Sequence, residues 1–368
     1  MTNCNLRINF IIIIFFVQST CCLSCRSQNI ETEKDIKLIP PNTGVYHGAF
    51  PDMGETEDSV TSERIQQFID LTGKSPAWVY FSNNWFNGIE FPRDEVLLIN
   101  QYGLLPFIRL MPRSNWNSDT PDPVYSLQNI NDGKFDEELL RWARDAKKTG
   151  VPIMVEFGTE VNGDWFPWCG IYNGGGETSG YGDSTLADGP ERFKDAYKHI
   201  IDLFAKENVK NVTWAFHVNS GSAPDESWNN FSAYYPGDEY IDWIGVSVYG
   251  MQNSDEEWQS FNEVFDNSYN TLASVSENKP LAIFEFGVAD EPKYGDKSQW
   301  IKEALKSIQE GKHPRIKAIS YWHSNWENED GSVTKTRIDS NPESLKGYRE
   351  YIADPFFIAF PILSGKNH

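Results

Sequence analysis

The stretch "FDEELLRWARDAKKTGVPIMVEFGTE" (residues 135–160) contains one helix followed directly by one strand candidate. In its first part, apolar side chains recur at three- and four-residue spacing, which predicts an amphipathic helix that stops at Gly150. These apolar positions are Phe135, Leu139, Ala143 and Ala146. The second part, 151–160, is a short apolar run and predicts a buried strand. A helix that leads into a buried strand is the building unit of α/β proteins.

The same alternation continues along the chain. Strands are predicted at 43–50, 76–82, 104–112, 151–160, 211–219, 241–250, 280–288 and 316–326. Further helices are predicted at 62–72, 92–102, 257–277, 297–311 and 342–353, and an apolar stripe that follows Pro190 predicts one more. Strands that alternate with helices pair in parallel, so eight such units predict a single (β/α)8 TIM barrel.

An open, doubly wound sheet is the alternative to a barrel. That fold predicts a phosphate-binding glycine turn after the first strand, and "HGAFPDMG" (47–54) fits such a turn poorly. The chain of 368 residues is long enough for one barrel, and its sequence has no internal repeat or second domain. We therefore assign residues 41–368 to one (β/α)8 domain.

The charge and the amino-terminal segment bear on partners and location. A net charge of −21 argues against nucleic acid, because phosphate binding needs a basic surface. Residues 1–25 resemble a signal peptide, with Arg7 before the apolar run 9–17 and a lipobox-like "LSC" that ends at Cys25. A polar tether is predicted at 26–40. These features predict a secreted protein or an outer-membrane lipoprotein of a bacterium, with membrane contact only through a lipid on Cys25.

Two glutamates lie at the carboxyl ends of predicted strands. Glu160 ends "IMVEFGTE" on the fourth strand, and Glu285 lies in "AIFEFG" on the seventh. In a barrel these strand ends surround the active site, so the two carboxylates are expected to converge. Glycoside hydrolysis needs such a pair: one carboxyl protonates the leaving oxygen while the other attacks the anomeric carbon or activates water. The alternative is that each glutamate is a solvated rim residue or an ion-pair partner.

Four stretches carry a family resemblance. "GTEVNGDWFPW" (158–168), "AIFEFG" (282–287), "YYPGDEYIDWIGVSVYG" (234–250) and the end of "TWAFHVN" (213–219) resemble glycoside hydrolase family 26, a set of retaining (β/α)8 enzymes. The resemblance implies Glu160 as acid/base, Glu285 as nucleophile, Tyr249 as hydrogen-bond partner of the nucleophile and Trp165 beside the acid. The family's mannanases commonly carry His before the acid. This chain has Thr159 there, which weakens a mannan assignment but not the hydrolase assignment.

Aromatic and amide side chains at the same strand ends are candidates for sugar contacts. Indole rings stack on the apolar faces of sugars, and amides bind their hydroxyl groups. The candidates are Trp165, Trp168, Trp322, Trp326, His217 and Asn219. The alternative for Trp168 is a place in the core, and the alternative for His217 is a buried histidine with a backbone partner. Trp85 and Trp116, on earlier loops, are further candidates that would extend the cleft.

Glu156 is expected to lie deeper in the barrel than Glu160 and to form a structural pair with Arg109, because a buried charge requires a partner. The sequence lacks metal-ligand spacing such as HExxH, so we expect no metal and no cofactor. The glycine-rich segment 172–189 is expected to form a loop beside the cleft. The sequence thus predicts a monomeric, retaining endo-β-glycosidase that acts on β-mannan or a related hemicellulose. A β-1,3-xylanase, a mixed-linkage glucanase and a non-catalytic glycan-binding protein are the alternatives.

Overall fold

Eight parallel strands close into a barrel, because the first strand pairs with both the second and the eighth. The computed structural model describes Met1 and residues 35–116, 120–328 and 331–365. The predicted signal peptide, Cys25 and most of the tether lie outside these residues. The barrel strands are β1 (Val45–Phe50), β2 (Trp78–Asn84), β3 (Leu105–Met111), β4 (Ile153–Phe157), β5 (Val212–Asn219), β6 (Trp243–Tyr249), β7 (Leu281–Gly287) and β8 (Ile316–Trp322).

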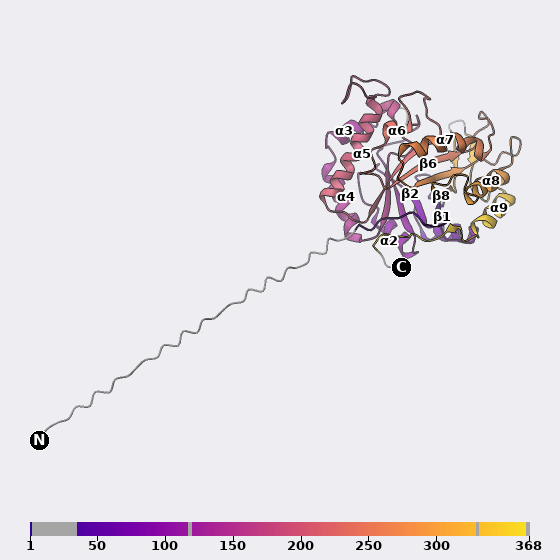
Figure 1. The fold of residues 1–368 in the computed structure, drawn as a ribbon, viewed down its shortest axis with the longest axis horizontal. Helices are drawn as coiled ribbons and strands as arrows, with labels where there is room; N and C mark the ends of the chain where they lie inside the picture. Colours follow the sequence, from indigo (N-terminus) through magenta and orange to yellow (C-terminus); the bar gives the residue numbers. More distant parts are fainter. Residues whose placement is uncertain (2–34, 117–119, 329–330, 366–368) are drawn as a thin grey trace. The chain divides into compact units, whose positions relative to one another are not determined.

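Helices connect the strands and cover the outside of the barrel (Figure 1). They are α1 (Ser62–Thr72), α2 (Arg93–Gln101), α3 (Leu127–Asn131), α4 (Asp136–Thr149), α5 (Asp188–Lys206), α6 (Phe231–Tyr234), α7 (Phe261–Val275), α8 (Lys297–Gln309) and α9 (Pro342–Ile352), with a 3₁₀ turn η1 (Gly170–Asn173). The predicted TIM barrel is therefore confirmed, as are all eight strand positions. None of the helices among the described residues is both long and apolar enough to span a membrane.

The sequence of α4 explains its boundaries and its packing. Leu139, Trp142 and Ala143 are buried on one face, as the apolar spacing predicts. Gly150 ends the helix in the left-handed conformation, with φ of 63°, which residues with a side chain rarely adopt. The helix then leads into β4, so the unit first seen in the sequence forms as predicted.

Two predicted strands are shorter than expected. The fourth ends at Phe157 because Gly158 and Glu160 both have positive φ, of 60° and 53°. This conformation is incompatible with an extended strand. The eighth ends at Trp322, and the chain then forms a hairpin of β9 (Asn325–Glu327) and β10 (Val333–Lys335). A short strand β11 (Phe357–Ile358) pairs with β1 outside the closed ring.

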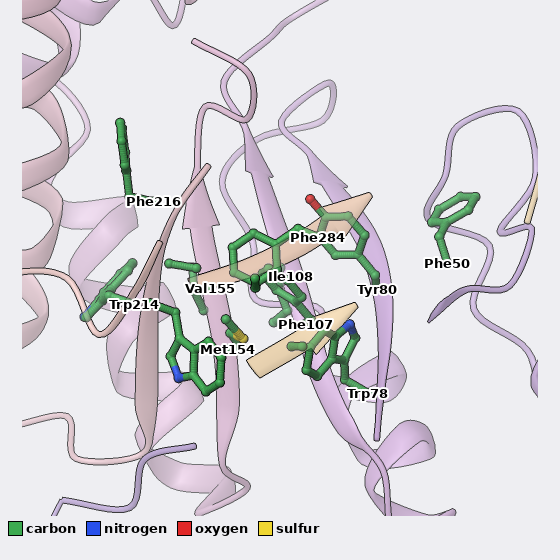
Figure 2. Close-up of a cluster of buried hydrophobic side chains, with 14 of the residues drawn as sticks. Phe50, Trp78, Tyr80, Phe107, Ile108, Met154, Val155, Trp214, Phe216 and Phe284 are labelled. Carbon is green, nitrogen blue, oxygen red and sulfur yellow. The ribbon is translucent and has the colours of Figure 1, made fainter. Parts of the chain in front are cut away.

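Large rings fill the lower part of the barrel interior. Trp78, Phe107 and Phe284 meet there edge to face, with centroids 5.0 to 6.5 Å apart (Figure 2). Two glycines on the strands make room for these rings. A Cβ on Gly245 would lie 1.8 Å from the ring of Phe284, and one on Gly48 would lie 2.2 Å from Trp78. Any larger residue at either position would displace the core.

Above this apolar layer the interior becomes charged. Ser82 on β2 is in register with Arg109 on β3, and Arg109 is in register with Glu156 on β4. All three side chains are buried, with at most 3% exposure. Since side chains alternate along each strand, Arg109 points inward like Phe107 two positions before it, and Ser82 and Glu156 lie level with Arg109 on the neighbouring strands. The polar layer lies toward the carboxyl ends of the strands, where the candidate site begins.

Candidate active site

A pocket of about 1160 Å³ opens at the carboxyl ends of the barrel strands. Seven of the predicted site residues line it: Glu160, Trp165, Asn219, Tyr249, Glu285, Trp322 and Trp326. They come from the ends of β4, β5, β6, β7 and β8 and from the β9 strand. Residues that are distant in sequence thus meet in one cleft, because parallel strands present all their carboxyl ends at one rim of the barrel.

Glu285 enters the pocket because β7 contains a bulge. Val246 pairs with Ile283, but the next residue, Ser247, pairs with Glu285, so Phe284 is the extra residue on β7. Phe284 packs in the barrel core, whereas its neighbour Glu285 lines the pocket. In a regular strand these two side chains would point to opposite faces. The bulge redirects the carboxylate into the cleft.

Glu160 reaches the pocket from a tight turn after β4. Its backbone φ is 53°, its amide donates to the carbonyl of His217 at 3.1 Å, and its carbonyl accepts from Gly163 at 2.9 Å. A glutamate with positive φ is uncommon, and such residues cluster at functional sites. The indole of Trp165 donates to Glu160 Oε2 at 2.7 Å, which fixes the carboxylate at the wall of the pocket.

The two oxygens of Glu285 have different surroundings. Oε2 accepts a hydrogen bond from the hydroxyl of Tyr249 at 2.9 Å. Oε1 makes no hydrogen bond among the described residues and lies 3.7 Å from Arg109 Nη2. Burial raises the pKa of Glu285 to about 7; Arg109 lowers it, and the charge of Glu160 raises it further. The carboxyl therefore gains and loses its proton near neutral pH.

Arg109 is the cation at the base of the pocket. It is 3% exposed, and its guanidinium lies over the rings of Tyr80 and Trp322, about 5 Å from each centroid. The predicted pair with Glu156 is confirmed, at 3.6 Å between Nε and Oε1. The pair is not exclusive, because Arg109 also contacts Glu57 at 3.0 Å and Glu285 at 3.7 Å.

Glu156 lies below the pocket and takes part in a buried network. It accepts hydrogen bonds from Tyr80 and, at 2.9 Å, from His217 Nδ1. Thr159 Oγ1 lies 2.9 Å from the same nitrogen, and Ser247 Oγ lies 2.9 Å from Nε2. Burial alone would lower the pKa of His217, but the charge of Glu156 and its hydrogen bond raise it above the usual value. Glu156 does not line the pocket.

Two predicted sugar contacts lie in the core instead. His217 is 2% exposed and its ring nitrogens are occupied by the network, so it does not line the pocket. Trp168 is 1% exposed, stacks on Phe166 and donates to the carbonyl of Thr159. The turn after β4 folds Trp168 inward, which leaves no ring face for a ligand. Trp168 thus lies in the core, which is the alternative for this residue. His217 is buried as in its alternative, but its partners are side chains rather than the backbone.

The two earlier tryptophans also differ from each other. Trp85 is fully buried and packs on Tyr125. Trp116 is 56% exposed and lies over the guanidinium of Arg113, but it does not line this pocket. Asn162, in the turn after Glu160, binds the carbonyls of Asn219 and Gly221 and therefore holds the loop rather than facing the cleft.

Sequence reasoning missed several polar residues of the pocket. Asp52 and Glu57 reach it from the loop after β1, Gln252 and Glu256 from the loop after β6, and Asn325 from the β9 strand. The acidic run "DMGETEDS" (52–59) is visible in the sequence. Whether these acidic side chains face the pocket, however, depends on contacts with β2 that no local sequence pattern specifies.

The segment 172–189, expected to form a loop beside the cleft, contributes no residue to the lining of this pocket. Asp188 instead accepts the amide of Gly180 and ties the segment to the start of α5. Within the described part of the chain, no group of three or more His, Cys, Asp or Glu side chains is placed to hold a metal ion. Cys169 is buried and forms no disulfide within the described residues.

A (β/α)8 barrel with two buried glutamates and several tryptophans in one cleft at its carboxyl rim is an arrangement typical of glycoside hydrolases. The sequence model of Glycosyl hydrolase family 26 matches residues 128–308, which include both glutamates. The chain belongs to this family.

Three relatives span different activities. Endoglucanase H of Acetivibrio thermocellus is 32% identical over 314 residues, covering 84% of this chain and 31% of the relative. Beta-1,3-xylanase TXYA of a Vibrio species is 21% identical, with 88% and 68% covered. Mannan endo-1,4-beta-mannosidase A and B of Caldalkalibacillus mannanilyticus is 24% identical, with 77% and 54% covered. The chain thus spans only about a third of the endoglucanase and about half of the mannosidase.

Solved structures agree on the fold. The GH26C protein of a Muricauda species superposes with a TM-score of 0.61 at 17% identity, covering 86% of this chain and 87% of that one. A GH26 beta-mannanase of Bacteroides ovatus gives a TM-score of 0.59 at 16% identity, with 89% and 95% covered. At such identities the likeness shows a shared (β/α)8 barrel and no more.

Proposed function

We propose that the protein is an endo-acting β-glycosidase that hydrolyses a β-linked polysaccharide by double displacement, with net retention. The observation that carries the proposal is that Glu160 and Glu285, from the ends of β4 and β7, line one tryptophan-rich pocket. The charge of Glu160 acts on the carboxyl of Glu285, so the two groups lie within electrostatic range of each other. Membership of the family supports the same reaction class.

In the first step, Glu285 attacks the anomeric carbon while Glu160 gives a proton to the leaving oxygen. The glycosidic bond breaks, and a glycosyl ester forms on Glu285. Tyr249 holds the carboxylate of Glu285 through Oε2, while Oε1 is buried and accepts no hydrogen bond among the described residues. In the second step, Glu160 takes a proton from water, the water oxygen attacks the same carbon, and the ester to Glu285 breaks. The sugar leaves and both carboxyl groups return to their starting states.

The pocket walls suit a neutral sugar chain. Trp165, Trp322 and Trp326 provide ring edges or faces, and Asn219 provides an amide. Several further acids line the cleft, including Glu55, Glu256 and Glu327. These charges would repel uronic acids and sulfated sugars, whereas carboxylates bind the hydroxyl groups of neutral sugars well.

For the polymer itself we propose β-mannan or a related hemicellulose, which the similarity to mannan endo-1,4-beta-mannosidases supports, with mixed-linkage β-glucan as a second candidate. The name of the relative at 32% identity, an endoglucanase, favours a glucan. So does Thr159, which stands where the family's mannanases commonly carry His and contacts His217 at 2.9 Å. β-1,3-Xylan is a third possibility because of the Vibrio relative.

The test compares wild type with Glu160→Ala and Glu285→Ala on mannan, glucomannan, mixed-linkage glucan and β-1,3-xylan. Wild type should release reducing ends and internal fragments from at least one polymer, and Glu285→Ala from none. With an activated aryl glycoside, Glu160→Ala should still form the glycosyl-enzyme, and added azide should yield a β-glycosyl azide. Proton NMR of the first wild-type product should show the β anomer. An α anomer would reject retention. Tight polymer binding without any turnover would favour a glycan-binding protein.

We further propose that the protein is exported and works as a monomer. The apolar run 9–17 and the "LSC" motif at Cys25 support a bacterial lipoprotein, with simple secretion as the alternative. Mass spectrometry of the mature amino terminus from expressing cells tests this proposal. A diacylglycerol-bearing Cys25 supports an anchor, and an unprocessed Met1 contradicts export. Light scattering of the purified domain tests the oligomeric state.

A further inference from the structure

We propose that Glu57, on the loop after β1, is a positioning residue that keeps Arg109 from closing on the Oε1 atom of Glu285 and so tunes the reactivity of this carboxylate. This inference rests on the proposed function, in which Glu285 is the nucleophile. Glu57 lines the pocket, and its side chain is 27% exposed. It reaches Arg109 across the end of β2, and it is 52 residues from Arg109 in the sequence.

The loop holds Glu57 in one place by contacts at three points. Its amide donates to the carbonyl of Gly54 at 3.0 Å, and its carbonyl accepts from the amide of Ser82 at 2.8 Å. Its Oε2 accepts from Ser82 Oγ at 2.7 Å. The backbone φ is 60°, a conformation that costs a non-glycine residue free energy. Such a residue persists only where its surroundings hold it, so this glutamate is fixed rather than a mobile surface acid.

Arg109 contacts three carboxylates, and its two terminal nitrogens lie at unequal distances from two of them, Glu57 and Glu285. Its Nη1 lies 3.0 Å from Glu57 Oε2, within hydrogen-bonding distance, whereas Nη2 lies 3.7 Å from Glu285 Oε1. The second distance is an ion pair without a hydrogen bond. The guanidinium is buried and lies against the rings of both Tyr80 and Trp322, so it has little freedom. The ion pair with Glu57 keeps the Arg109 guanidinium from moving to hydrogen-bonding distance of Glu285.

This sharing matters for attack. A guanidinium that made two close hydrogen bonds to Glu285 would occupy Oε1 and stabilise the carboxylate, which lowers its nucleophilicity. At 3.7 Å the cation still favours the ionised form of Glu285, yet the buried Oε1 accepts no hydrogen bond from it, so the carboxylate is stabilised less strongly. Glu57 thus lets Arg109 favour the ionised form of Glu285 without forming the close hydrogen bonds that would lower its nucleophilicity.

Other titratable groups surround Arg109 and the two carboxylates Glu57 and Glu285. Glu156 on β4 and His217 on β5 lie beneath them, Tyr80 on β2 and Tyr249 on β6 flank them, and Glu160 lies across the pocket. None of these groups changes in a Glu57 variant. Loss of the Glu57 charge removes one anion near Glu285 and releases Arg109 toward it. Both effects favour the ionised form of Glu285, so its pKa should fall.

The experiment compares wild type with Glu57→Gln, using Glu90→Gln as a control that removes the same charge from an exposed side chain on the loop after β2. In Glu57→Gln the acid limb of the kcat/KM profile should move down by roughly 0.5 to 1 pH unit, and kcat on the plateau should fall about 10-fold. The control should match wild type. Ser82→Ala, which loosens Glu57 without removing its charge, should give a smaller shift in the same direction.

Carboxyl-carbon NMR gives a second readout that needs no turnover. The Glu285 signal is assigned by its loss in Glu285→Gln and then titrated in wild type and in Glu57→Gln. A lower Glu285 pKa in the variant supports the inference even if no polymer is hydrolysed, which would count against the proposed function alone. An unchanged pKa, or an acid limb that stays in place while only thermal stability falls, would reduce Glu57 to a structural partner of Arg109 and overturn the inference.

Discussion

Trp165 Nε1 lies 2.7 Å from Glu160 Oε2, five residues away along the chain and on the same wall of the pocket. The ring lies flat against Gly163, where an added Cβ would come within 2.6 Å of it. The turn after β4 therefore requires a small residue at 163 so that the indole can reach the carboxylate. The aromatic side chain orients the acid and borders the cleft at the same time.

The first prediction concerns this hydrogen bond. Trp165→Phe keeps a ring in the cleft but leaves Glu160 without its donor, so proton transfer to the leaving oxygen should weaken. We expect kcat on the polysaccharide to fall about 10- to 100-fold, the size expected for a hydrogen bond to a charged group. An aryl glycoside with an acidic leaving group should lose much less. Equal losses on both substrates would mean that Trp165 binds sugar without assisting the acid.

The second prediction concerns Tyr249, whose hydroxyl donates to Glu285 Oε2 at 2.9 Å. Tyr249→Phe removes a donor that favours the ionised carboxyl, so the pKa of Glu285 should rise. The acid limb of the kcat/KM profile should then move to higher pH, opposite to the shift expected for Glu57→Gln. A pH series on both variants measures this. Shifts in the same direction would show that the hydrogen bond and the ion pair do not act on the same carboxyl.

The third prediction links Glu285 to stability. Its pKa is about 7 in the folded protein and 4.5 as an unperturbed side chain. Because the folded-state value is raised, the stabilising effect of the neutral form is complete below pH 4.5 and is lost as pH rises through about 7. The melting temperature of Glu285→Gln should therefore exceed that of wild type, and the difference should grow as pH rises between these two values. At pH 8 the free energy of unfolding of the variant should exceed that of wild type by about 3 kcal/mol. A constant difference in melting temperature across this range would contradict the raised pKa.

The wild-type pH profile provides a consistency check on the same group. Attack requires ionised Glu285, so kcat/KM should rise through about pH 7. A profile already flat from pH 5 upward would argue that the substrate-free carboxyl is ionised at lower pH than burial implies.

The barrel was predictable because its signals are local. Apolar runs, amphipathic spacing and stops such as Gly150 are contained within segments of fewer than twenty residues. The two glutamates were found for a related reason, since strand ends of a parallel barrel must meet at one rim. Parity along a strand also placed Glu156 correctly below the pocket, where it is fully buried.

The remaining features depend on tertiary contacts. Parity alone would not predict that Phe284 and Glu285 both face inward, because the bulge appears only in the pairing of β7 with β6. Trp168 follows the acid in the loop after β4 and His217 lies near the end of β5, but hydrogen bonds with the Thr159 carbonyl and with Glu156 hold their side chains in the core. Glu57 enters the site through contacts with Ser82 and Arg109 that lie 25 and 52 residues away.

The last prediction separates the buried network from the chemistry. Glu156→Gln leaves His217 and Arg109 without a buried anion that both contact, which should cost about 3 to 5 kcal/mol of stability. The pKa of His217 is raised in the folded protein, so its stabilising contribution is complete below pH 6.5 and is lost as pH rises through the folded-state value. The variant should therefore lose more stability at pH 6 than at pH 9, as measured by urea unfolding. Below its melting temperature it should keep far more activity than Glu160→Gln, because Glu156 does not line the pocket. A stably folded Glu156→Gln as inactive as Glu160→Gln would make Glu156 part of the reaction rather than its support.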